Sequence, residues 1–277
     1  MDYAAPDALL AQPPGTLQRF KQYPLFSDAD IAALARAMAA QRMEAVRPLA
    51  DETLLLDIQT RLDSRGYQLQ APLTVRTRPP SDGQRLPDRE VWTPFAAFLA
   101  DLPRLLSIAG AQRLHIRGRG HITVAFALGG AVPTTSSWPV TIEDQYSATW
   151  GRTDQQQRSR HVGLKVESEP VPAGSQVAGA PVAIYVDLAN TEPPGDTFAG
   201  HLASHHGRYA GAMRLQAARR GLIPADSANT LVTDVVKRIR GCAARASTHR
   251  VHLFLRVSFP IAVLLGRTLN TLEVTLY

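Results

Sequence analysis

One stretch of this chain occurs twice, and the repeat limits the possible folds more than any other sequence feature. Residues 114–131 align with residues 251–268 without a gap. The aligned pairs include His115 with His252, Arg119 with Arg256, Ala125 with Ala262, Leu128 with Leu265 and Gly129 with Gly266. Each copy follows an apolar helical pattern and precedes a strand pattern, so the order of elements is repeated as well. The repeat predicts two similar α/β halves.

Strand patterns alternate with helical patterns through both halves. We expect strands at 72–78, 113–117, 140–142, 162–166, 182–186, 251–255 and 272–277. We expect helices from Thr93, over 122–129, over 198–220, from Asn229 and from Pro260, with Pro103 kinking or splitting the first. Such alternation is typical of parallel βαβ construction, so the predicted fold class is α/β with parallel sheets.

The N-terminal part has a different pattern. Residues 1–22 have little periodicity, and a capping signal at Ser27 precedes an apolar helical stripe. A second helix is expected from Asp51 to Gly66, because Leu54 and Ile58 have helical spacing. We therefore divide the chain into an arm with a helical hairpin (1–66), a first half (67–168) and a second half (169–277).

Composition excludes several classes of protein. The chain is 45% hydrophobic and 19% charged, which is typical of a globular protein. Its single cysteine, Cys242, excludes an intramolecular disulfide framework and a cysteine-rich zinc module. There is no apolar run of membrane-spanning length and no secretion signal, so we expect a cytoplasmic protein. The formal net charge of +6 favours anionic partners.

The two repeated turns are the best candidates for an anion site. In parallel sheets, ligands gather at the carboxyl ends of strands, where helix N-termini present backbone N–H groups. Both turns carry an arginine in the same place, Arg119 and Arg256. Two such turns facing each other would bracket an anionic ligand of near two-fold shape, and a cyclic oligonucleotide has that shape.

The C-terminal stretch resembles the ending of SAVED domains. The resemblance lies in the strand 251–255, the helix start 259–266 with its Leu-Gly ending, Asn270, and the terminal strand 274–277. The first-half segment 115–129 and the strand 182–186 also fit, so the resemblance covers about residues 70–277.

This resemblance implies a fold and a function. SAVED domains are similar to two fused CARF-like, Rossmann-derived units. They sense cyclic di-, tri- or tetranucleotide messengers in the CBASS and type III CRISPR anti-phage systems, and messenger binding activates an effector, often by oligomerisation. No effector pattern is visible here, so the effector (a nuclease, TIR domain, protease or membrane protein) would be a separate chain or a fused segment. We expect no catalysis, cofactor, resident metal, or direct binding to DNA or membranes.

The candidate ligand-binding residues follow from the turns and the resemblance. Arg119 and Arg256 would neutralise phosphates, with backbone amides near His121 and Ser258 donating hydrogen bonds. Phe259 would stack on a base, and Asn190 and Thr191 would contact phosphates or base edges. Further candidates are Gly120, Thr123 and Lys165.

Other functions remain open at this point. A ring nuclease would degrade the messenger, and a plain structural partner would bind none. Gly118-x-Gly120 after a strand, with Glu143 downstream, favours an NAD(P)- or FAD-dependent enzyme, although Thr123 replaces the third glycine. His201, His205 and His206 are spaced for a helix face, but they lack a convincing further metal ligand. Trp138 and Trp150 are either stacking residues or core.

Overall fold

The computed structural model describes residues 51–61, 73–81, 89–151, 162–169, 179–189, 196–205, 207–218 and 221–277. By their contacts they form two units. One unit contains the described residues up to His121 together with Ser136–Gln145, and the other contains Ile122–Thr135 together with Tyr146–Tyr277. The expected helix start at Ser27 lies outside the described residues.

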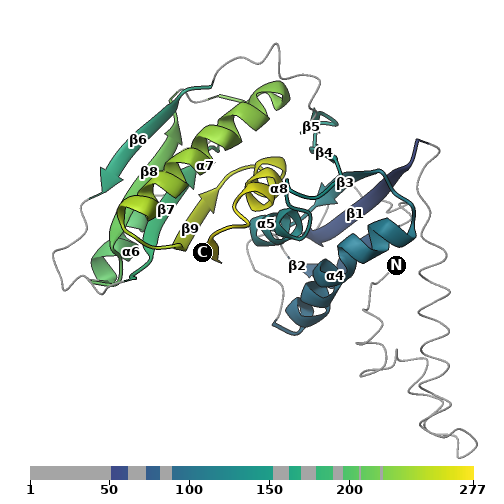
Figure 1. Ribbon diagram of the computed structural model, residues 1–277, viewed down its shortest axis with the longest axis horizontal. Helices are drawn as coiled ribbons and strands as arrows, with labels where there is room; N and C mark the ends of the chain where they lie inside the picture. Colours follow the sequence, from purple (N-terminus) through teal and green to yellow (C-terminus); the bar gives the residue numbers. More distant parts are fainter. Residues whose placement is uncertain are drawn as a thin grey trace, which may run out of the picture. The chain divides into compact units, whose positions relative to one another are not determined.

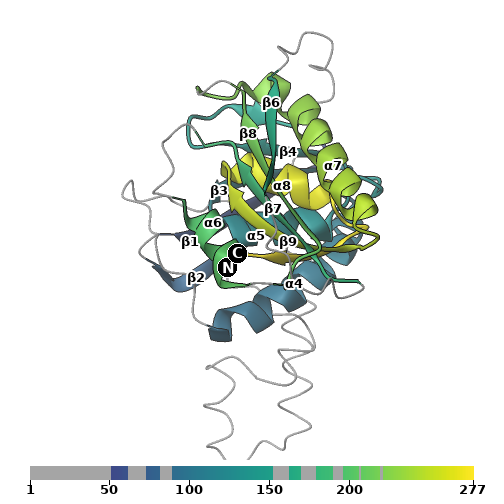
Figure 2. The ribbon, with the colours of Figure 1, turned by 90° about the vertical axis from the view of Figure 1, so that its left-hand side faces the viewer.

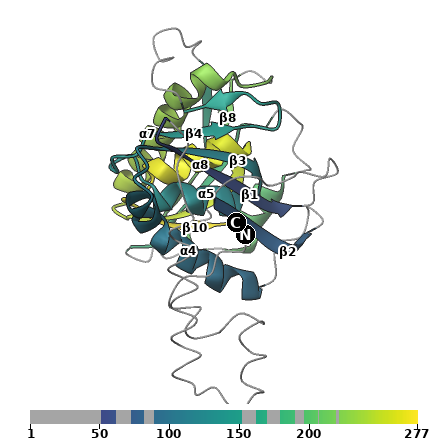
Figure 3. The ribbon, with the colours of Figure 1, turned by 90° about the vertical axis from the view of Figure 1, so that its right-hand side faces the viewer.

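The first sheet has five strands in the order β2-β1-β3-β4-β5. Its strands are β1 (Thr53–Arg61), β2 (Leu73–Ser81), β3 (Arg113–Arg119), β4 (Val140–Glu143) and β5 (Thr149–Trp150). β1 is an interior strand and pairs in parallel with β2 and with β3, which lie side by side with it in Figure 3. The helix α4 (Arg89–Ile108) connects β2 to β3, and α5 (Ile122–Ala131) connects β3 to β4. α4 continues through Pro103, so the expected split does not occur.

The prediction of a helix from Asp51 to Gly66 was wrong. Thr53–Arg61 is instead β1, an interior strand of the first sheet that lies between β2 and β3. Leu54, Leu56 and Ile58 are fully buried on one face, and Asp57 is fully buried on the other. A central strand of a parallel sheet is covered on both sides, so its apolar run lacks the period-two signal of an ordinary strand and is easily mistaken for a helix.

The second sheet also has five strands, in the order β10-β9-β7-β8-β6. They are β6 (Leu164–Glu169), β7 (Val182–Asp187), β8 (Gly211–Ala217), β9 (Arg250–Arg256) and β10 (Glu273–Leu276), of which β6 is antiparallel to its neighbour. The helices are α6 (Thr197–Ser204), α7 (Ala228–Arg245) and α8 (Phe259–Thr268), and a short 3₁₀ turn, η2 (Ala225–Ser227), precedes α7. From β7 the chain reaches β8 through α6 on one side and then β9 through α7 on the other. Right-handed crossovers therefore place α6 and α7 on opposite faces of the sheet, as Figure 2 shows.

The expected helix over 198–220 is only partly correct. α6 ends at Ser204, and Gly211–Ala217 forms the strand β8. The β8 sequence GAMRLQA is rich in good helix formers. Pairing with β7 on one side and β6 on the other overrides this local preference, because a strand between two neighbours satisfies its backbone groups on both edges.

Two glycines allow α5 and α8 to cross with their backbones in contact (Figure 1). A Cβ on Gly129 would lie 2.0 Å from the Val263 carbonyl oxygen, and one on Gly266 would lie 2.0 Å from the Phe126 carbonyl oxygen. The repeat aligns these two glycines, and it also aligns Phe126 with Val263. The contact is therefore reciprocal, with equivalent residues making equivalent approaches.

The strand registers confirm the duplication. Leu54 stands opposite Leu114 in the first sheet, and Val182 stands opposite Val251 in the second. Since the repeat aligns Leu114 with Val251, β1 corresponds to β7 and β3 corresponds to β9. The order β2-β1-β3-β4 thus matches β8-β7-β9-β10, and the fold is α/β with two similar halves, as predicted.

Candidate ligand site

Four residues form one register row across the second sheet at the carboxyl ends of its parallel strands. They are Lys165, Gln216, Asp187 and Arg256, on β6, β8, β7 and β9. Lys165 joins this edge because β6 runs antiparallel, so its first residues lie beside the last residues of β8. Three strand spacings separate it from Arg256, on the order of 14 Å. The exposed Lys165 ammonium also forms an ion pair with Glu167 on the same strand.

Arg256 is the residue predicted to bind a phosphate in this half. An acid on the adjacent strand holds its side chain. Its Nη1 donates to both carboxylate oxygens of Asp187, at 3.1 and 3.0 Å. Burial raises the pKa of the nearby Tyr185 hydroxyl, with the Asp187 charge adding to the effect. The guanidinium is therefore fixed in orientation, and a carboxylate compensates its charge.

α8 begins three residues after Arg256. Ser258 is the N-cap residue, is exposed, and makes no side-chain capping hydrogen bond. Pro260 has no N–H, so the backbone amides of Phe259 and Ile261 are the first donors of this helix end. These amides and the positive end of the helix dipole suit a phosphate. The half-buried Phe259 is at the first helical position.

The corresponding turn in the first half is built differently. The repeat places Arg119 in the position of Arg256, and Arg119 stands opposite the neutral Gln59 on β1. The backbone N–H of His121, expected to be available to a ligand, donates to Thr60 Oγ1 at 3.0 Å, and the His121 ring contacts the same hydroxyl at 3.0 Å. Thr60 thus fixes the chain just before α5.

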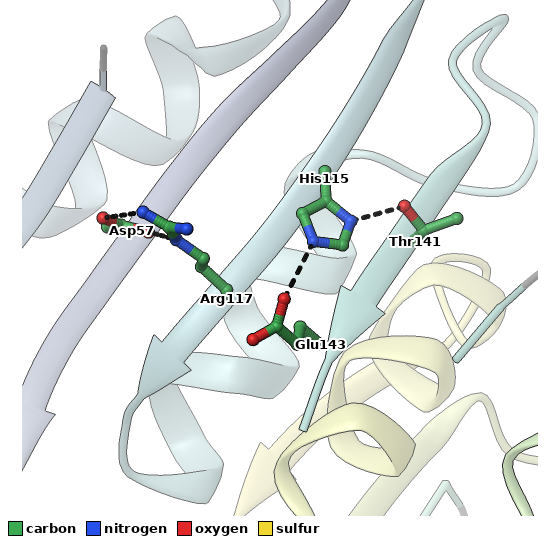
Figure 4. Close-up of polar contacts among 5 residues, drawn as sticks. All are labelled: Asp57, His115, Arg117, Thr141 and Glu143. Carbon is green, nitrogen blue, oxygen red and sulfur yellow. Dashed lines mark hydrogen bonds and ion pairs between the residues drawn. The ribbon is translucent and has the colours of Figure 1, made fainter. Parts of the chain in front are cut away.

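The first sheet also contains two groups of polar residues (Figure 4), and the pair Asp57 and Arg117 was not among the residues predicted for a site. Arg117 Nε and Nη2 donate to the fully buried carboxylate of Asp57, Nη2 at 3.1 Å. On the same strand, His115 Nδ1 lies 2.8 Å from Thr141 Oγ1. His115 Nε2 lies 3.7 Å from a Glu143 carboxylate oxygen. An acid within or at the end of an apolar strand run, as in LLLDIQ and VAIYVD, was the available signal for Asp57 and Asp187.

The remaining predicted residues are only partly placed. Gly120 is buried in the turn before α5. Thr123 is in the first turn of α5, and its hydroxyl oxygen is buried without a hydrogen-bond partner among the described residues. Asn190 and Thr191 lie outside the described residues. Arg119 and Arg256 belong to different units, so the idea that both bind one ligand stays a prediction.

The glycine pair that favoured a dinucleotide enzyme has a structural explanation. Gly118 has φ +115°, and a Cβ there would lie 2.1 Å from the Ile58 carbonyl oxygen. The close approach of β3 to β1 therefore requires this glycine without any ligand. Glu143, the expected ribose-binding acid, faces His115. Trp150 is a buried core residue, and the partly buried Trp138 is held by its Nε1, which donates to the Ala111 carbonyl at 3.0 Å.

Two of the three histidines considered as metal ligands, His201 and His205, belong to an aromatic–histidine cluster on the α6 face of the second sheet, and His206 lies outside the described residues. The cluster contains Tyr185, Phe198, His201, His205, Tyr209, His252, Phe254 and Tyr277. His201 Nε2 lies 2.7 Å from the Tyr209 hydroxyl, and His252 Nδ1 lies 3.0 Å from the Tyr277 hydroxyl. Burial lowers the pKa of His201 and of His252. No group of metal-ligating side chains occurs among the described residues.

The strand order and the repeated halves define a class of α/β proteins with two similar parallel-sheet units, and comparison with known proteins gives the family. The model of the SAVED family, the SMODS-associated and fused to various effectors sensor domain, matches residues 99–277. The chain belongs to the SAVED family, which confirms the resemblance found in the sequence. Among curated proteins, none matches the sequence. No helix within the described parts of the chain is long and apolar enough to span a membrane.

Solved structures show the same fold. The chain is similar to the Cap4 SAVED/CARF-domain receptor of Acinetobacter baumannii, solved with the cyclic trinucleotide 2'3'3'-cAAA, at 16% identity and a TM-score of 0.58, over 90% of this chain and 52% of that one. The same receptor with 3'3'3'-cAAA gives a TM-score of 0.58 at 16% identity, over 90% and 53%. The Moraxella osloensis Cap4 receptor gives 0.54 at 11% identity, over 98% and 61%. The chain thus spans about half to three-fifths of the length of these receptors.

Proposed function

We propose that this chain is a sensor domain that binds a cyclic oligonucleotide messenger, in bacterial anti-phage defence. The observation that carries the proposal is membership of the SAVED family, together with a fold similar to receptors solved with cyclic trinucleotides. The carboxyl-end edge of the second sheet supports it, because an oriented arginine and an uncapped helix start lie there next to each other.

The binding chemistry is electrostatic and stacking in character. Arg256 and the first amides of α8 contact a phosphate of the messenger, and Phe259 stacks on a base. Arg119 serves the same purpose in the first half, and Lys165, Gly120 and Thr123 contribute around these contacts. Asn190 and Thr191 follow the end of β7 in sequence and contact phosphates or base edges.

The proposed output is activation of an effector, either a separate chain or a fused segment, by ligand-driven oligomerisation. The free energy for this change comes from a higher affinity of the messenger for the activating arrangement than for the resting one. This chain performs no chemical step in the proposal and needs no cofactor.

Binding to a panel of cyclic di-, tri- and tetranucleotides tests the proposal directly. We expect at least one member to bind in calorimetry, to raise the melting temperature, and to increase the oligomer size in chromatography. Phe259→Ala should weaken binding by about 5- to 150-fold, because stacking on one base contributes about 1–3 kcal/mol. Tyr146→Ala, which removes a 70% exposed aromatic side chain, is the control and should leave the affinity unchanged.

Three outcomes contradict the proposal. Binding of no panel member removes the sensor assignment. Linear oligonucleotides after incubation indicate a ring nuclease, and stabilisation by NAD(H) or FAD alone indicates a dinucleotide-dependent enzyme.

A further inference from the structure

Asp187 is at the centre of the carboxyl-end edge of the second sheet, and its carboxylate connects two parts of that edge. One oxygen accepts hydrogen bonds from Arg256 Nη1 on β9, at 3.1 Å, and from the Ala189 backbone N–H, at 3.2 Å. The other oxygen accepts a second bond from the same Nη1, at 3.0 Å. Asp187 is only 8% exposed, so these contacts satisfy a carboxylate that has lost most of its water.

The first half shows that strand pairing does not require an acid at this position. Gln59 occupies the register position of Asp187, and it stands opposite Arg119 as Asp187 stands opposite Arg256. The two halves share their strand order and register, yet only the second has a carboxylate here. Asp187 therefore has a purpose beyond joining the central strand to its neighbour.

The negative charge of Asp187, taken by itself, is unfavourable in a site that binds anions. A carboxylate beside a phosphate repels it, and the low dielectric near a buried side chain increases the repulsion. What the carboxylate supplies in return is orientation. The charge-assisted contact to the guanidinium holds a long side chain in one geometry before the ligand arrives.

We propose that Asp187 is a positioning residue of the messenger site, which holds the Arg256 guanidinium and the Ala189 turn in the geometry that receives a phosphate. This inference rests on the proposed function. It states that the Asp187 carboxylate orients Arg256, the principal cation of the proposed messenger site. The arginine is then ordered before binding, so the messenger does not bear the entropic cost of ordering it.

The variant Asp187→Asn separates positioning from charge, because the two roles predict opposite results. If Asp187 acted only as a nearby negative charge, its removal would strengthen binding of the anionic messenger. If it positions Arg256, we expect affinity for the panel member that binds the wild type to fall about 10- to 100-fold, the range for losing a charged hydrogen bond. The salt dependence of binding should also become shallower, as in Arg256→Gln, since a phosphate contact is lost.

Two further variants complete the experiment. Glu273→Gln is the matched control, because Glu273 pairs with Arg250 at the opposite end of β9, where both side chains are exposed. It should change neither affinity nor salt dependence. Arg256→Lys keeps the charge and removes the planar fork, so it should lose affinity as Asp187→Asn does, and it decides the question if Asp187→Asn fails to fold.

Unchanged or stronger binding by Asp187→Asn, with wild-type salt dependence, would overturn the inference. So would wild-type affinity in Arg256→Lys. If the wild type binds no cyclic oligonucleotide, the proposed function itself has failed, and that result is distinct from the failure of Asp187 as a positioning residue.

Discussion

The two halves of the molecule share a backbone plan but place their buried ion pairs differently. In the first half Asp57 pairs with Arg117, and in the second Asp187 pairs with Arg256. By register, the second pair is two residues further along its strands, nearer the helix start. A shift of two residues keeps a side chain on the same face of a sheet. The two halves therefore differ in the position of the ion pair along one face of the sheet, while the opposite face is apolar in both.

The histidines extend the comparison. His115 and His252 are equivalent in the repeat, but His115 contacts Thr141 and Glu143, whereas His252 contacts the hydroxyls of Tyr209 and Tyr277. Register places Tyr277 in the position of Glu143, one residue beyond the pairing of Leu276 with Leu253. In the first half an acid and a hydroxyl contact the histidine, whereas in the second half two tyrosine side chains contact it.

The largest expected effect is on the free energy of unfolding, and it differs between the two ion pairs. Arg117→Ala removes the guanidinium partner of the fully buried Asp57 and should lower the free energy of unfolding by about 3–5 kcal/mol. Arg256→Ala should cost less, about 1–3 kcal/mol, because Asp187 keeps the Ala189 amide and some exposure.

Denaturant unfolding measures both variants. Arg113→Ala is the control, since Arg113 is on the same strand as Arg117 but forms an exposed ion pair with Asp51 at 4.0 Å, and its loss should cost at most about 1 kcal/mol. A larger loss of unfolding free energy in Arg256→Ala than in Arg117→Ala would contradict the expected order of the two ion pairs.

The next effect concerns the crossing of α5 and α8, where the halves should behave alike. Gly129→Ala and Gly266→Ala each place a methyl group 2.0 Å from a carbonyl oxygen of the opposite helix, so each should cost about 1–3 kcal/mol or more. Gly130→Ala is the matched control, because no atom lies within 4 Å of its Cβ position. Alanine should stabilise the helix there by up to about 1 kcal/mol.

Thermal and denaturant unfolding of these three variants tests the reciprocity. If only one of the two aligned glycines is sensitive to alanine, the crossing is not symmetric in energy, whatever its geometry.

The smallest effect is the pH dependence contributed by two histidines of the second half. Burial lowers the pKa of His201 and His252 below the ordinary histidine value of about 6.5, so the unfolded chain binds these protons more readily than the folded one. Their contribution to stability is complete above pH of about 6.5 and is lost as the pH falls from there through the lowered folded pKa values.

Unfolding at pH 7.5 and at pH 5.5 should therefore show lower stability at the acidic value. His201→Gln should reduce this difference, while the first-half variant His115→Gln should leave it in place, because His201 and His252 remain. A wild type more stable at pH 5.5 than at pH 7.5 would contradict the assignment.

Local patterns predicted most of the strands and the start of α8, but they failed at β1 and β8. Both failures occurred in strands with a neighbour on each side. β1 is an apolar run covered on both faces, and β8 is composed of helix-forming residues. In each case pairing with strands distant in sequence decided the structure, and no local pattern records that pairing. The same reason explains why Asp57 and Asp187 were missed while Arg256 was proposed.

The sequence alone determined the duplication and the family, because aligned residues are local properties of the chain. Only the tertiary structure decided which acid meets which arginine. Arg117 is 60 residues from Asp57, and Arg256 is 69 residues from Asp187. Their contact depends on strand order, register and face together, and a buried charge takes the partner that this geometry brings within hydrogen-bond distance.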